Sequence, residues 1–294
     1  MPNNDNYIPF SQRNGYAEVP PQLKIGVVSD DLRRLLGLAI SNEMHRKIQD
    51  NTFVEYKSNI GKVFKHDWYY FTKDIYVRLF KKKSENYSPI VDVINKYFID
   101  TCHCAEIGSL FDLIEFFARK SMTSKLMISQ EFHDDLHNAF IDARTAYRLM
   151  DGQIMAIGTE EQGEAVQNAL SNTKEYGADA ARSHLISSGV ALRNGEWSDS
   201  IRESIHSVES VALLLNNGAN TLGDALNKIE KKGQVHPSLK KAFRTLYGYT
   251  SDQDGVRHAK VYEDTVKVDE ADALFMLGAC ASFVSYLLAR NDFS

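Results

Sequence analysis

The order of apolar and polar positions predicts helices through most of the first half of the chain. After Ser29, a residue type that commonly caps helices, apolar side chains recur three and four positions apart: Leu32, Leu35, Leu36, Ala39 and Ile40. Amphipathic patterns, several of them rich in aromatic residues, predict further helices at residues 64–82, 88–98, 105–119 and 130–147. This half of the chain therefore has the pattern of a helical domain.

The period changes between residues 147 and 158, in the segment YRLMDGQIMAIG. Two short apolar runs flank Asp151-Gly152, a dipeptide that favours a two-residue turn between paired strands. We therefore expect a short β-hairpin here. A domain boundary just after it gives one domain at residues 1–158 and a second at 159–294.

Helical patterns return in the second domain. They predict one long helix at residues 161–192, ending near Asn194-Gly195, and another from Asp199 to Leu215. Shorter helices are expected after Thr221 and in the segment HPSLKKAFRTLYGY, before a final helix that Asp269 can cap. The predicted fold class is mainly all-α, with two helical domains and a short hairpin near their boundary.

The final helix is apolar on nearly every side, which indicates burial inside a helical bundle. The segment 271–289 is long enough to cross a membrane, but Asp272 and small polar residues lie within it, so we expect no membrane span. Small residues share one face of this helix: Ala271, Gly278, Ser282, Ser285 and Ala289. Such a face lets another helix approach closely, either inside the domain or from a second subunit.

The composition is that of a soluble globular protein. Hydrophobic residues make up 43% and charged residues 25% of the 294 positions, and the net charge is −5. A chain with this charge contacts nucleic acid only through a local basic patch. Three cysteines and a polar N-terminal stretch without an apolar core predict a reducing, cytoplasmic location and no signal peptide.

An arginine and a histidine, Arg257 and His258, follow the turn-forming pair Asp254-Gly255 between two predicted helices. A guanidinium suits a phosphate, and an imidazole moves a proton near neutral pH. Cleavage of RNA by attack of the 2′-hydroxyl needs both functions. The alternative is structural: Arg257 bonds carbonyls at a helix end, and His258 packs over a nearby tyrosine.

The predicted helix at 199–215 adds candidates. Arg202, His206 and Glu209 lie on one side of it, by their spacing of four and three residues. Glu209 is expected to orient Arg257 or His258 in a catalytic site. Substrate-binding candidates are drawn from this helix and from the loop: Arg202, His206, Lys260 and Tyr262. The alternative for the helix residues is a partly solvated edge of ion pairs.

Three other motifs favour a structural interpretation. HDDLH at 133–137 places two histidines one turn apart, but it has Asp where zinc proteases have Glu, and no third ligand follows. CHC at 102–104 lacks a second cysteine pair. RLFKKK at 78–83 could contact phosphates, although it also suits a solvated helix end. We therefore expect no metal ion and no cofactor.

The C-terminal part, residues 160–294, resembles the HEPN superfamily of helical nuclease and nucleotide-binding domains, in the form found in AbiJ-type abortive-infection proteins. The resemblance lies in SIRESIHSVESVALLL (200–215), NTLGDALNKIEKKGQVHPSLKKAFRTLYGYTSD (220–252), GVRHA (255–259) and ADALFMLGACASFVSYLL (271–288). The N-terminal part, opening with FSQRNGY (10–16), is similar to an AbiJ-associated N-terminal domain.

This resemblance implies a helical bundle that dimerises and cleaves RNA without a metal, at a site across the dimer cleft. It also implies a role in abortive infection, in which a cell halts its own translation when a phage arrives. The implied partners are RNA, a second copy of the chain, and an antitoxin or a phage-derived trigger. The N-terminal domain would then sense the trigger or restrain the activity.

The family's catalytic pattern is an arginine followed four to six residues later by a histidine, and this chain departs from it. No histidine occurs from 259 to 264, so Arg257 and His258 are either a compact pair or a degenerate site. Two functions therefore remain open. One is a ribonuclease effector of phage defence, and the other is an inactive HEPN-like module that binds RNA, a nucleotide or a protein as a dimeric scaffold.

Overall fold

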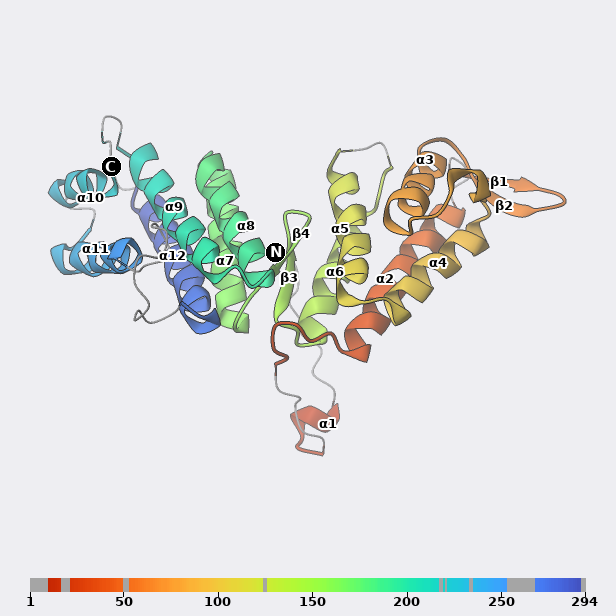
Figure 1. Cartoon of the computed structure of the whole chain (residues 1–294), viewed down its shortest axis with the longest axis horizontal. Helices are drawn as coiled ribbons and strands as arrows, with labels where there is room; N and C mark the ends of the chain where they lie inside the picture. The colour runs from red at the N-terminus through yellow and green to blue at the C-terminus, as the bar shows by residue number, and fades with distance from the viewer. Residues whose placement is uncertain are drawn as a thin grey trace. The chain divides into compact units, whose positions relative to one another are not determined.

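The computed structural model describes residues 10–16, 22–49, 53–123, 126–216, 219, 221–232, 235–252 and 268–291. These residues are mainly helical with two small two-stranded sheets, which confirms the predicted fold class (Figure 1). The chain divides into two compact units, Met1–Ile154 and Met155–Ser294. The predicted domain boundary near residue 158 stays a prediction.

The N-terminal unit combines helices with two hairpins, the second of which ends two residues past Ile154. Helix α2 packs against both α4 and α6, and β1 pairs antiparallel with β2, with Val54 opposite Phe64. A π-helical turn at Ile75–Leu79 extends α3. The elements are α1 (Phe10–Arg13), α2 (Asp30–Gln49), β1 (Val54–Lys57), β2 (Gly61–Phe64), α3 (His66–Asp74), α4 (Val91–Cys104), α5 (Ile107–Thr123), α6 (Gln130–Asp142), β3 (Tyr147–Met150) and β4 (Gln153–Ala156).

Aromatic side chains fill the core of this unit. Trp68 stacks on Phe64 with ring centroids 5.5 Å apart and meets Phe71 edge-on at 5.4 Å. The chain of ring contacts continues from Phe71 through Phe117 to Phe132. Trp68, Phe117 and Phe132 are fully buried, and Phe64 and Phe71 are also buried, so most of this ring chain belongs to the core.

Local signals set two of the predicted elements. The Ser29 hydroxyl accepts a hydrogen bond from the Leu32 amide at 3.2 Å and begins α2, as predicted. The predicted hairpin is also present as β3 and β4. Asp151 and Gly152 have φ of 52° and 70°, and left-handed conformations at both positions are what the favoured hairpin turn requires.

The helix predicted at residues 130–147 ends earlier, at Asp142. Arg144 has a left-handed φ of 49°, and the Thr145 amide returns to the Phe140 carbonyl at 3.2 Å, which closes the helix end. Tyr147 therefore belongs to β3, where its ring meets Phe111 edge-on at 4.9 Å. The apolar pattern at 130–147 continues past the end of α6 because α6 and β3 both face the same core.

The C-terminal unit is a helical bundle. Helices α7, α8, α9 and α12 pack against one another, and α10 and α11 contact α9 (Figure 1). The helices are α7 (Glu160–Glu175), α8 (Asp179–Arg193), α9 (Trp197–Leu214), α10 (Leu222–Lys231), α11 (Pro237–Asp252) and α12 (Glu270–Asn291). Asp269 caps α12 as predicted, since its side chain accepts the amide of Asp272. Thr221, after which a short helix was predicted, caps α10 by accepting the amide of Asp224.

The single long helix predicted at 161–192 is wrong, because the structure divides this segment into α7 and α8. Gly177 adopts a left-handed φ of 65°. The Ala178 amide donates to the Thr173 carbonyl at 2.8 Å, and the Gly177 amide donates to the Lys174 carbonyl at 3.4 Å. This pair of bonds is a Schellman motif, which ends α7 and lets α8 begin in a new direction.

Helix α12 is long and apolar enough to cross a membrane, but 56% of that stretch is buried by its neighbours, as in a core helix. Its small residues serve two surfaces. A Cβ added at Gly278 would lie 3.3 Å from Gln162 Cγ, so this glycine admits α7. Ala271, Ser282 and Ala289 are exposed, and dimerisation through this face stays a prediction.

Candidate functional site

The predicted catalytic pair lies outside the described residues. Arg257, His258, Lys260 and Tyr262 fall within residues 253–267, which connect α11 to α12 along the chain. Helix α11 contacts α9, and α12 packs along it. The catalytic roles of Arg257 and His258, and the substrate-binding roles of Lys260 and Tyr262, stay predictions.

The candidates on the helix predicted at 199–215 are all described, and this helix is present as α9. Arg202, His206 and Glu209 are half-buried. Arg202 forms an ion pair with Asp199 one turn earlier, which agrees with the alternative of a half-solvated edge for this residue. His206 instead lies beside a residue of α8.

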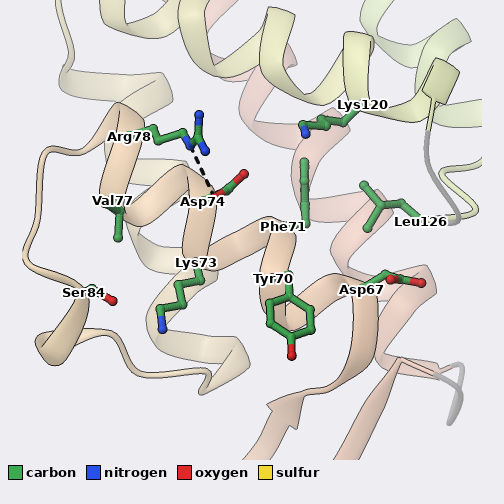
Figure 2. A pocket seen from close by; sticks show the side chains of 10 residues that line it. All are labelled: Asp67, Tyr70, Phe71, Lys73, Asp74, Val77, Arg78, Ser84, Lys120 and Leu126. Atoms are coloured by element: carbon green, nitrogen blue, oxygen red, sulfur yellow. Dashed lines mark ion pairs between the residues drawn. The ribbon is translucent and has the colours of Figure 1, made fainter.

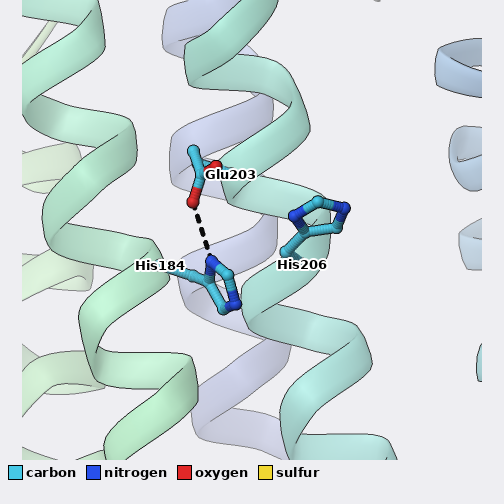
Figure 3. A group of neighbouring side chains, drawn as sticks. All are labelled: His184, Glu203 and His206. Atoms are coloured by element: carbon cyan, nitrogen blue, oxygen red, sulfur yellow. Dashed lines mark hydrogen bonds and ion pairs between the residues drawn. The ribbon is translucent and has the colours of Figure 1, made fainter. Parts of the chain in front are cut away.

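Three side chains gather where α8 meets α9: His184 from α8, and Glu203 and His206 from α9 (Figure 3). The His184 Nδ1 lies 2.7 Å from Glu203 Oε2, and the two imidazole centroids are 5.2 Å apart. One ligand atom from each residue lies within 4.8 Å of the other two. All three side chains are half-buried, so solvent still reaches them.

A layer of buried serines explains why these helices bring the cluster together. The Ser188 hydroxyl of α8 lies 2.8 Å from the Ser200 carbonyl and 2.7 Å from the Ser204 hydroxyl, both on α9. These small side chains are fully buried, so the two helices approach closely at this level. His184 is one turn from Ser188, which places it opposite Glu203 and His206.

The cluster combines two imidazoles with a carboxylate, a set suited to proton transfer or to a transition metal. The Glu203 carboxylate fixes the orientation of the His184 ring through the Nδ1 contact. Of the two predicted substrate-binding residues that the structure describes, Arg202 and His206, it is His206 that lies in this group.

Sequence reasoning missed His184 and Glu203. The signal within α9 was visible, because Glu203-Ser204-Ile205-His206 has the Glu-x-x-His spacing that aligns two ligands on one helical face. His184 was not recognisable, since its place opposite these residues depends on the register in which α8 packs against α9.

The HDDLH segment lies on α6 in the N-terminal unit. His133, Asp134 and His137 line a pocket of about 370 Å³ together with Asp151. Burial lowers the pKa of both imidazoles, and the charge of Arg148 lowers that of His137 further. Among the described residues, the group of three possible metal ligands, His184, Glu203 and His206, lies in the C-terminal unit and does not include His133 or His137.

The CHC segment ends α4 and agrees with a structural role. Burial raises the pKa of the Cys102 thiol to about 12, so at neutral pH it is an uncharged core group. The ring of His103 lies against Gly37 of α2, where a Cβ would come within 3.2 Å of the imidazole. These contacts join α4 to α2.

The basic run at 78–83 begins at a pocket of about 480 Å³ (Figure 2). Arg78 lines it with Lys73 and Lys120, and pairs with Asp74 at 3.4 Å. The exposed ring of Tyr70 forms part of the same lining. Contact with nucleic-acid phosphates stays a prediction for this surface.

Comparison with known protein families gives a match over the N-terminal part. The family model described as AbiJ N-terminal domain 4 matches residues 9–172, which is more than half of the 294 residues. The match covers the described elements from α1 to β4 and continues into α7. No curated protein and no solved structure matches the chain.

Proposed function

The chain belongs to the AbiJ family defined by N-terminal domain 4, and from this premise we propose that it is an effector of abortive-infection phage defence. The family match over residues 9–172 carries this proposal. In such a system the N-terminal unit detects a phage-derived trigger or restrains the effector, and the C-terminal unit delivers the response. An antitoxin that holds the effector inactive fits the same scheme.

The proposed response is metal-independent cleavage of RNA by the C-terminal unit. Its support is the helical bundle of α7, α8, α9 and α12, together with the resemblance of residues 160–294 to HEPN domains. In the proposed mechanism the 2′-oxygen attacks phosphorus and the bond to the 5′-oxygen breaks. His258 moves the proton from the 2′-hydroxyl to the leaving 5′-oxygen, and Arg257 stabilises the charge of the phosphorane. Glu209, half-buried on α9, is the proposed positioning residue for this pair.

A phage challenge tests this proposal. We expect cells that carry the wild-type chain to arrest growth and fragment their RNA after infection, and cells with His258→Ala to do neither. An exchange of the exposed His45 on α2 for Ala is the matched control and is expected to leave the defence intact. Growth arrest with RNA fragmentation in the His258→Ala cells would contradict the assigned mechanism.

A second function is favoured by one observation, the missing histidine between residues 259 and 264. In this alternative the C-terminal unit is an inactive dimeric scaffold that binds RNA, a nucleotide or a protein. Size-exclusion chromatography combined with an RNA-cleavage assay separates the two functions. A dimer that never cleaves RNA, with or without infected-cell extract, supports the scaffold.

A further inference from the structure

A metal-binding spacing lies on one face of α9. Glu203 and His206 are three residues apart, so their side chains project from the same side of the helix. This Glu-x-x-His spacing supplies metal ligands in helical bundles, where ligands from facing helices converge between them. Helix α8 is the facing helix here, since it packs directly against α9.

His184 supplies a third ligand from α8. Its Nδ1 lies 2.7 Å from Glu203 Oε2, and its ring centroid is 5.2 Å from that of His206 (Figure 3). The three ligand atoms lie within 4.8 Å of one another. Ligands around a tetrahedral zinc ion are about 3.4 Å apart, given Zn–N and Zn–O bonds of about 2.1 Å.

The change needed to hold an ion is small. The His184 and Glu203 atoms must separate by less than about 1 Å, and the His206 ligand atom must move toward them by up to about 1.4 Å. The His184 and Glu203 side chains can make this adjustment, because 33% of the His184 and 22% of the Glu203 side-chain surface is accessible. The backbone is held in register by the Ser188 hydrogen bonds to Ser200 and Ser204.

We propose that His184, Glu203 and His206 bind a zinc ion whose fourth coordination position is open to water or an anionic oxygen. Two imidazoles and one carboxylate form the donor set of open zinc sites, whereas Mg²⁺ and Ca²⁺ prefer oxygen ligands alone. The carboxylate supplies one negative charge to the ion, and binding replaces the His184–Glu203 contact with two bonds to zinc. The bound ion joins α8 to α9.

The zinc proposal rests on His184, Glu203 and His206 and needs neither Arg257 nor His258, so either proposal can fail alone. The test uses the full-length protein, stripped of metal with a chelator and titrated with Zn²⁺ in a calorimeter. We expect one zinc ion per chain. Titration with Co²⁺ is expected to give the visible absorption of a tetrahedral site with mixed nitrogen and oxygen ligands.

Variants locate the ion. His206→Ala and Glu203→Gln are each expected to weaken zinc binding at least ten-fold, because loss of a direct ligand costs at least as much as loss of its supporting contacts. Glu203→Gln nearly preserves side-chain volume, so a folded protein is expected even if His206→Ala proves unstable. Circular dichroism of the metal-free variants checks their fold.

The other histidine pair provides the matched control. The double variant His133→Ala/His137→Ala removes the two neighbouring imidazoles of α6 and is expected to bind zinc with unchanged affinity. Zinc binding that is lost in this control, or that persists unchanged in Glu203→Gln and His206→Ala, would overturn the proposed site. Binding only at millimolar zinc would overturn it as well.

Discussion

At the residue scale, the carboxylate of Glu43 is a fully buried charge, so it depends on hydrogen bonds and nearby cations. Its side chain has no accessible surface, yet it receives hydrogen bonds from the Ser129 hydroxyl at 2.7 Å and from Arg46 Nε at 2.8 Å. Lys47 lies 3.2 Å away. Burial alone would raise the pKa of Glu43, but the bonds from Ser129 and Arg46 and the charge of Lys47 outweigh it and lower the pKa.

We predict that Glu43→Gln lowers the free energy of unfolding by about 3 kcal/mol at pH 7, because it leaves the charges of Arg46 and Lys47 without their buried partner. A lowered carboxyl pKa contributes stability above the unfolded value of about 4.3, and that stability is lost as the pH falls through the folded value. The difference between wild type and variant should therefore shrink below about pH 4. Urea unfolding at several pH values measures it.

The control for this experiment is Glu85→Gln, in an exposed turn of the same unit. It should leave the unfolding free energy nearly unchanged at every pH. A Glu43→Gln protein as stable as wild type at pH 7 would show that the ionised carboxylate does not stabilise this core.

At the element scale, close helix packing depends on single small residues. A Cβ added at Gly189 of α8 would lie 2.9 Å from Met155 Cβ and 3.0 Å from Met155 Cγ. Atoms so near the backbone cannot move aside as the end of a flexible side chain can. The backbone at Gly189 has an ordinary helical φ, which any residue can adopt. It is therefore the close contact with Met155 that requires a glycine here.

We predict that Gly189→Ala destabilises the C-terminal unit by about 1–3 kcal/mol, the usual cost of overpacking. Gly223→Ala on α10 is the matched control, because the nearest atom to its Cβ would be the Thr221 hydroxyl at 3.9 Å. The control should be neutral or slightly stabilising. Thermal unfolding of both variants provides the comparison, and equal melting temperatures would contradict the packing argument.

How much could be predicted from the sequence also differs between elements. Caps and turns at Ser29, Asp151-Gly152 and Asp269 depend on neighbouring residues, so the sequence alone identified them. The break at Gly177 was missed because apolar positions recur at helical spacing on both sides of it. The His184 partner was missed because contact between residues 184 and 203 depends on helix packing.

At the scale of the whole molecule, the proposed effector requires two copies of the chain. On α12, the helix predicted to form the dimer contact, the Phe275 side chain is 56% exposed near exposed small residues of the same helix. Aromatic side chains are enriched in contact surfaces between subunits, so an exposed phenylalanine is a candidate contact residue.

We predict that Phe275→Glu converts a dimer of the chain into a folded monomer, because a buried charge without a partner opposes association. Light scattering coupled to size-exclusion chromatography measures the mass. Leu214→Glu, at a position 49% exposed at the end of α9, is the matched control and should leave the mass unchanged. A wild-type monomer, or a Phe275→Glu dimer, would contradict dimerisation through α12.

The buried serines between α8 and α9 have a consequence for ion selectivity. Ser188 and Ser204 hold α8 close to α9, and in the proposed zinc site this spacing sets how large a cation His184 and His206 can enclose. A larger residue at position 188 would push the helices apart and favour a cation of greater radius. Discrimination between ions would then be controlled by side chains that never touch the ion.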